Sequence, residues 1–126
     1  MMLAIVSRMD KMPALTTHVL DTMKGGPAAG IRIRLLASEG GRSLAEAETD
    51  ASGRAALAPP NGGPLAEGRY DLIFAVGAYF AGAGAADAQP RFLDEVVIRF
   101  GMQAGQAHYH VPLLISPFGY TTYRGQ

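Results

Sequence analysis

The sequence predicts one all-β domain, a two-sheet Greek-key sandwich of seven or eight strands with one short helix. Three observations carry this prediction. The chain has 126 residues, a length that suits a single domain. Its 16 glycines and 8 prolines fall between short apolar runs. Turn signals recur about every ten residues, a spacing typical of β-sandwiches.

Short apolar or alternating runs define the predicted strands. We expect strands, in chain order, at residues 15–21, 31–36, 43–49, 54 onward, 69–76, 92–100, 107–115 and 120–124. Residues 15–21 (LTTHVLD) are rich in β-branched side chains, which favour strands. In residues 31–36, apolar and basic side chains alternate, so one face of that strand should be buried and the other hydrated.

Glycine, proline and aspartate mark the connections. We expect turns or loops at residues 24–27, 50–53, 59–68 and 116–119. Gly53 can adopt a positive φ in a hairpin turn, so Arg54 should open the returning strand. Asp21 and Asp50 stand where aspartates cap turns, which favours that role over a catalytic one. Residues 78–88 are mostly alanine and glycine and should hold the one short helix.

Composition excludes several classes of protein. Hydrophobic residues make up 48% and charged residues 17% of the chain, which excludes a disordered protein. Eleven basic residues balance eleven acidic ones, so we expect neither a nucleic-acid nor an anionic-membrane partner. Without cysteine there is no disulfide, thiolate nucleophile or cysteine-ligated metal. No apolar stretch is long enough to span a membrane, and the run at residues 1–6 is too short for a secretory signal, so a cytoplasmic protein is expected.

Three histidines are the candidates for chemistry. By alternation, His18 shares a strand face with Thr16, and His108 and His110 share a face of a later strand. A strand histidine is most often a packing or surface residue. An H-x-H pair with His18 as a third ligand could also bind zinc, although no acidic residue is obviously placed to complete such a site. Arg54, taken alone, is an ordinary solvated arginine.

Two segments resemble the signatures of a known family. THVLD at 17–21 with GPAAG at 26–30, and HYHVPLLISPFGYTTYRG at 108–125, resemble the two ends of the transthyretin-like 5-hydroxyisourate hydrolases. TDASGR at 49–54, Tyr79-Phe80 and residues 92–100 follow the order that the family shows. The likeness covers residues 15–126, which divides the chain into an N-terminal extension, 1–14, and a hydrolase domain, 15–126.

The resemblance implies a prealbumin-like sandwich that assembles as a homotetramer, a dimer of dimers, with active sites in the channel where the dimers meet. It implies hydrolysis of 5-hydroxyisourate by water in urate degradation, with no metal or organic cofactor. The implied catalytic residues are His18, Arg54 and His110, and the implied substrate-binding residues are Tyr123, Arg124, Gly125 and Gln126. His108 is at most a neighbour of this site.

The implied residue types suit the reaction. Histidine titrates near neutral pH and can take a proton from water, and arginine stays charged beside a developing oxyanion. One position departs from the family, whose final serine is replaced here by Gln126. Glutamine keeps an amide donor and acceptor but is bulkier, so we expect activity to be retained with altered substrate binding. The alternative is that Gln126 partly blocks the pocket.

Two other functions compete with the hydrolase. A non-enzymatic small-molecule carrier on the transthyretin fold shares the Ser-Pro-x-x-Tyr turn at 116–120. The carriers lack the first-strand histidine, and they have a smaller residue at the position of Tyr123, where a tyrosine should close the channel into shallow pockets. A purely structural sandwich is the third possibility, and it leaves the joint presence of His18, Arg54 and His110 without explanation.

Overall fold

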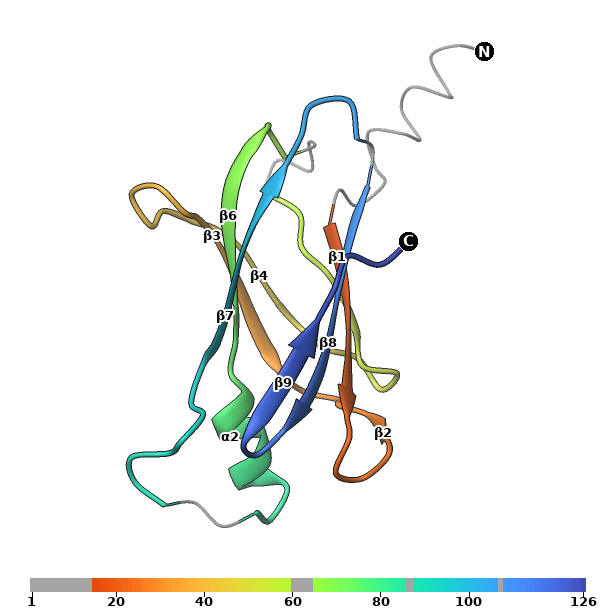
Figure 1. Ribbon diagram of the computed structural model, residues 1–126, viewed down its shortest axis with the longest axis vertical. Helices are drawn as coiled ribbons and strands as arrows, with labels where there is room; N and C mark the ends of the chain where they lie inside the picture. Colours follow the sequence, from red (N-terminus) through yellow and green to blue (C-terminus); the bar gives the residue numbers. More distant parts are fainter. Residues whose placement is uncertain (1–14, 60–64, 86–87, 107) are drawn as a thin grey trace.

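Two β-sheets pack face to face around an apolar interior (Figure 1). The computed structural model describes residues 15–59, 65–85, 88–106 and 108–126, so the predicted extension at 1–14 lies outside the described residues. The elements are β1 (Leu15–Asp21), β2 (Gly26–Pro27), β3 (Arg32–Ala37), β4 (Ser43–Glu48), β5 (Arg54–Ala56), β6 (Gly68–Phe74), α2 (Val76–Gly82), β7 (Val96–Met102), β8 (Tyr109–Ser116) and β9 (Gly119–Thr122). The predicted sandwich is confirmed, and within the described residues it has one short helix and nine strands, rather than the seven or eight predicted.

Strand β1 is the central strand of the sheet that matters for the site. It pairs in parallel with β8 along its whole length, and its other edge pairs with both β5 and the two-residue β2. Beyond β8, the antiparallel β9 forms the far edge of this sheet. The second sheet has the order β4-β3-β6-β7, with every pair antiparallel.

Alternation along β1 and β8 separates the interior from the outer face. Leu15, Val19, Leu113 and Ile115 are fully buried between the sheets. Thr16 and His18, which alternate with these residues on β1, are partly exposed on the outer face. A strand that buries every second side chain therefore presents its polar residues together on the opposite side.

Several predicted boundaries were wrong, mostly around the helix. The strand predicted at 69–76 ends at Phe74, and the helix predicted at 78–88 spans Val76–Gly82 instead. Val76 and Phe80 lie one helical turn apart and are both buried, so the apolar sequence continues from strand into helix without a visible break.

The later strands also begin or end differently. The strand predicted at 92–100 starts only at Val96, because the preceding chain packs against the helix, where Gly77 N–H donates to the Asp94 carbonyl at 2.7 Å. The strand predicted at 107–115 spans Tyr109–Ser116, and residue 107 is outside the described residues. The strand predicted at 120–124 spans Gly119–Thr122. The short β2 lies where only a turn was predicted.

Two buried polar side chains fasten the loops to the sandwich. The Thr49 hydroxyl donates to the Ala28 carbonyl at 2.7 Å and accepts from Ile31 N–H at 2.9 Å. The buried Asp21 carboxylate accepts a hydrogen bond from the Tyr79 hydroxyl at 2.8 Å, which ties α2 to the end of β1. Burial, together with the bond to this carboxylate and its charge, raises the pKa of Tyr79 to about 12.

No helix in the described parts of the chain is long and apolar enough to cross a membrane.

We predict that Thr49→Val lowers the free energy of unfolding by about 1–3 kcal/mol, because it leaves a buried N–H and a buried carbonyl without a partner. Denaturant unfolding would measure the change. Ser43→Ala, which deletes an exposed hydroxyl on β4, is the control and should change stability by no more than about 0.5 kcal/mol. Equal effects of the two substitutions would contradict the prediction.

Candidate functional site

A cavity of about 400 Å³ lies on the outer face of the sheet, where β5, β1 and the start of β8 meet. The register of the paired strands explains why these residues lie together, since His18 stands opposite Arg54 and Thr16 stands opposite His110. The lining residues are Thr16, Thr17, Asp50, Arg54, Ala55, Ala56, His108, His110 and Gln126. The pairing of distant strands thus gathers three of the seven predicted site residues around one cavity.

The turn before β5 sets the position of Arg54. Gly53 has φ 79°, and a Cβ there would lie 2.5 Å from the Val19 carbonyl oxygen, so only glycine fits. This close approach allows Val19 N–H to donate to the Gly53 carbonyl at 2.8 Å. The Arg54 side chain is exposed and makes no hydrogen bond or ion pair with any other residue that the structure describes. Its guanidinium is therefore free to bind a carbonyl or an anion.

Asp50 holds the turn and is not available as a base. One carboxylate oxygen accepts hydrogen bonds from Ser52 N–H, the Ser52 hydroxyl and Arg54 N–H, at 2.8–3.0 Å. The bond from the Arg54 backbone, followed by the one from the Ser52 hydroxyl, holds the pKa of Asp50 below its ordinary value. The predicted turn-capping role of Asp50 is thereby confirmed, and its carboxylate faces the cavity as a fixed negative charge.

His110 has the surroundings of a neutral imidazole. Its Nδ1 lies 2.9 Å from the Thr16 hydroxyl, and no residue within the described ranges bonds to its Nε2. Burial is the largest cause that lowers the pKa of His110, and the positive charges of His108, Arg54 and His18 lower it further. An interaction with the Thr16 backbone opposes this shift. A neutral imidazole with a free nitrogen can accept a proton.

His18 stands opposite Arg54 in the strand register but does not line the cavity, and one hydrogen bond defines its tautomer. Its Nε2 is 3.0 Å from the Ser52 carbonyl oxygen, which can only accept, so Nε2 carries a proton. In the neutral ring, Nδ1 is therefore the acceptor. Among residues 15–59, 65–85, 88–106 and 108–126, no three histidine or acidic side chains are arranged to hold a metal ion, so the zinc alternative finds no ligand set there.

The C-terminal segment contributes unequally to this cavity. Gly125 forms an isolated bridge with His110, and a Cβ at Gly125 would lie 2.5 Å from the His110 ring. Gln126 lines the cavity. Tyr123 and Arg124 instead line a separate cavity of about 580 Å³ at the open edge between β7 and β9.

Arg124 has partners of its own in that second cavity. Its guanidinium lies 4.3 Å from the centroid of the Tyr109 ring, and one of its nitrogens donates to the Gln106 side chain at 3.2 Å. Tyr109 precedes His110 on β8 and so points to the opposite face of the sheet. Within the single chain, therefore, Tyr123 and Arg124 do not reach the histidines, and their role in binding substrate stays a prediction.

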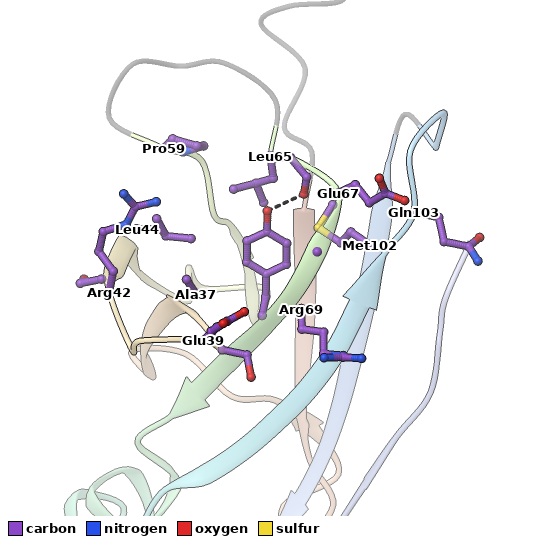
Figure 2. Close-up of a pocket in the computed structure, with 15 residues that line it drawn as sticks. Ala37, Glu39, Arg42, Leu44, Pro59, Leu65, Glu67, Arg69, Met102 and Gln103 are labelled. Carbon is purple, nitrogen blue, oxygen red and sulfur yellow. Dashed lines mark hydrogen bonds between the residues drawn. The ribbon is translucent and has the colours of Figure 1, made fainter.

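The largest cavity is elsewhere and lacks these chemical groups. It measures about 1,320 Å³ and lies at the end of the second sheet away from α2, beside the start of β6 and the end of β7 (Figures 1 and 2). Its rim carries both signs of charge, with Glu39 and Glu67 near Arg42 and Arg69. None of its described lining residues is a histidine or a predicted site residue. Selecting a cavity by size alone would therefore select one that no predicted site residue lines.

Sequence reasoning did not recognise the importance of Thr16. Its hydroxyl lies 2.9 Å from both His108 Nε2 and His110 Nδ1. Alternation places Thr16 on the same face as His18, but its contact with residues more than 90 positions away depends on the parallel pairing of β1 with β8. The predicted common face of His108 and His110 is confirmed, since their rings lie nearly parallel, 17° apart in plane.

Comparisons with known proteins agree with this architecture. The chain is 52% identical over 113 residues to a 5-hydroxyisourate hydrolase of Mesorhizobium japonicum, an alignment that covers 88% of this chain and 90% of the relative. The solved structure of Klebsiella pneumoniae 5-hydroxyisourate hydrolase matches with a TM-score of 0.76 and 38% identity, over 91% of this chain and 100% of the other. Sea bream transthyretin in complex with thyroxine matches with a TM-score of 0.77 and 27% identity, over 89% and 94% of the two chains.

A family profile matches almost the same part of the chain. The profile described as the HIUase/Transthyretin family matches residues 15–125, which is nearly the whole of the part that forms the sandwich. The match spans both segments on which the sequence resemblance was based and every strand of the two sheets. The chain therefore belongs to the HIUase/Transthyretin family.

Proposed function

We propose that this protein hydrolyses 5-hydroxyisourate to 2-oxo-4-hydroxy-4-carboxy-5-ureidoimidazoline, a step of urate degradation. One observation carries the proposal: His110 and Arg54 line the same cavity, and no other residue in the described part of the chain bonds to His110 Nε2 or to the Arg54 guanidinium. A base and a fixed positive charge are the two groups that attack of water on a ring carbonyl needs. The names of the relatives at 38–52% identity support the same substrate.

The proposed reaction begins with water in the cavity. His110 takes a proton from this water at Nε2 while the water oxygen forms a bond to the ring carbonyl carbon. The negative charge that develops on the carbonyl oxygen is stabilised by the positive charge of the Arg54 guanidinium. His110 then returns the proton to the ring nitrogen as the carbon–nitrogen bond breaks, and the ring opens to a carboxylic acid, which ionises at neutral pH.

The other site residues orient the substrate in this scheme. His18 accepts a hydrogen bond from a ring N–H at Nδ1, since its Nε2 proton is already donated to Ser52. Gly125 and Gln126 form the wall beside His110. The family resemblance alone supports substrate binding by Tyr123 and Arg124. The scheme uses no metal or organic cofactor, because His110 and Arg54 supply the base and the positive charge.

We further propose the finer properties that the family implies. Residues 15–126 form the hydrolase domain after an N-terminal extension at 1–14, and the bounds of the profile match support this division. The protein forms a homotetramer, a dimer of dimers, in the cytoplasm. The outer edge strands β7 and β9, with the exposed Tyr120 and Val97, offer surfaces on which copies could associate.

The alternative is a small-molecule carrier, as the transthyretin structure with thyroxine suggests for that protein. A carrier needs an apolar site and has no use for an unpartnered arginine beside a neutral histidine. The lower identity to transthyretin, 27% against 38–52% for the hydrolases, also favours the enzyme.

We predict that His110→Asn and Arg54→Ala each lower kcat/KM by about 100-fold or more, since each removes a group that acts in the transition state. Urate oxidase would generate the substrate in situ, and its decay would be followed by ultraviolet absorbance. Arg32→Ala, which removes an exposed arginine from the other sheet, is the matched control for Arg54→Ala. Decay no faster than the spontaneous rate, with folded wild-type protein, would rule out the hydrolase and leave the carrier.

The pH profile should report the lowered pKa of His110. Because the base acts when neutral, kcat/KM should fall with decreasing pH only below about 6.5, the ordinary pKa of histidine, and should be level between that value and pH 8. Removing a nearby positive charge by Arg54→Gln should raise the pKa of His110, observed by NMR titration, whereas Arg32→Gln should not. If kcat/KM began to fall above the ordinary pKa of histidine as the pH was lowered, the lowered pKa of His110 would be contradicted.

A side chain at position 125 should damage the site through His110. We predict that Gly125→Ala lowers kcat/KM by about 100-fold, because the added Cβ displaces either the ring or the Gly125 bridge. Gly82→Ala is the control, since a Cβ there meets nothing within 4 Å. If Gly125→Ala matched the control in activity, the close packing on His110 would have no functional role.

A further inference from the structure

The Thr16 hydroxyl lies between two histidines. Its oxygen is 2.9 Å from His108 Nε2 and 2.9 Å from His110 Nδ1. The two rings are nearly parallel, with centroids 6.5 Å apart. Thr16 and His110 are partly buried, whereas His108 is exposed. One hydroxyl thus lies within hydrogen-bond distance of two imidazoles, one partly buried and the other exposed.

Counting hydrogens limits the possible arrangements. A hydroxyl has a single hydrogen and can donate to only one of the two rings. When both rings are neutral, the nitrogen of the other ring that faces the hydroxyl must itself carry a proton and donate it. Either Thr16 donates to His108 and accepts from His110, or it donates to His110 and accepts from His108. The tautomers of the two histidines are therefore linked through Thr16.

The two arrangements differ at the nitrogen that faces the substrate. If His110 donates from Nδ1, its Nε2 has a free electron pair and can act as a base. If His110 instead accepts at Nδ1, the proton lies on Nε2 and the ring cannot take a proton from water. Only the arrangement in which His108 accepts the Thr16 hydrogen provides the base that hydrolysis needs.

We propose that Thr16 and His108 form a positioning pair that sets the tautomer of His110 and keeps its Nε2 free of a proton. This inference rests on the proposed function and assigns a role to His108, which the family resemblance leaves as a neighbour. The carboxylate–histidine pair of other hydrolases orients the catalytic ring in the same way, by accepting from the nitrogen remote from the reaction. Here a hydroxyl does so, and a second histidine orients that hydroxyl.

Several charged or titratable groups surround His110. The groups that face His110 from the neighbouring elements are His18 on β1, Arg54 on β5, Asp50 in the turn and His108 before β8, and the positive ones among them lower the pKa of His110 after burial does.

The test compares two pairs of variants. Thr16→Val removes the hydroxyl at constant shape and Thr16→Ser retains it, while His108→Ala removes the acceptor and His108→Gln retains an acceptor that does not titrate. Nitrogen-15 NMR of the histidine rings gives the tautomer of His110 without reference to activity. We expect protonated Nδ1 in the wild type, Thr16→Ser and His108→Gln, and a shift of the proton toward Nε2 in Thr16→Val and His108→Ala.

The value of kcat should fall in the variants in which the His110 tautomer changes. We expect Thr16→Val and His108→Ala to lower kcat by about 10-fold or more with little change in KM, and the double variant to lose no more than the worse single variant. The Ser and Gln variants should retain most of the rate.

An unchanged His110 tautomer in Thr16→Val, failure of Thr16→Ser to restore it, or losses that multiply in the double variant would overturn the proposal. An inactive wild type with the expected tautomers would overturn the proposed hydrolysis and leave the positioning pair in place.

Discussion

The parallel pairing of β1 with β8 is the constraint on which the site depends. Burial of Leu15, Val19 and the facing side chains of β8 fixes which face of each strand points inward. A shift of one residue in register would turn every apolar side chain outward, so the register is held by the hydrophobic effect. Because side chains alternate, the same register places Thr16 beside His110 on the outer face. The catalytic geometry is thus a consequence of core packing rather than of separate contacts.

The second edge of β1 completes this arrangement. β5 is only three residues long, and its position depends on the turn at 50–53, where Gly53 approaches the β1 backbone and Asp50 binds the Arg54 backbone. Within the described residues, the side chains of Asp50, Ser52 and His18 bond to this turn, and the Arg54 guanidinium makes no hydrogen bond or ion pair. The bonds that hold the Arg54 backbone are therefore separate from its guanidinium, the group that we propose binds the substrate.

Local sequence patterns were sufficient to predict most of the fold. Alternation and turn residues predicted the two sheets, and the Asp50–Gly53 turn was located correctly because its chemistry is local. The end of β6 was missed because Val76 and Phe80 continue an apolar run into α2, where burial rather than periodicity decides the structure. His18, Arg54 and His110 were found through motifs, but the bond from Thr16 to two histidines depends on pairing across more than 90 residues. The place of Arg124 over Tyr109 was missed because it depends on how the chain after β9 returns along β8, which no local motif specifies.

The neighbouring residues Tyr109 and His110 connect the two cavities of this sheet. They point to opposite faces of β8, and the segment after β9 contacts both, with Arg124 on the Tyr109 ring and Gly125 on the His110 ring. Gly125 N–H also donates to the His110 carbonyl at 2.8 Å, which joins the backbone of the C-terminal segment to β8 beside the His110 ring. Because Arg124 and Gly125 are consecutive, the residues after β9 link the cavity at the β7–β9 edge to the cavity that His110 lines.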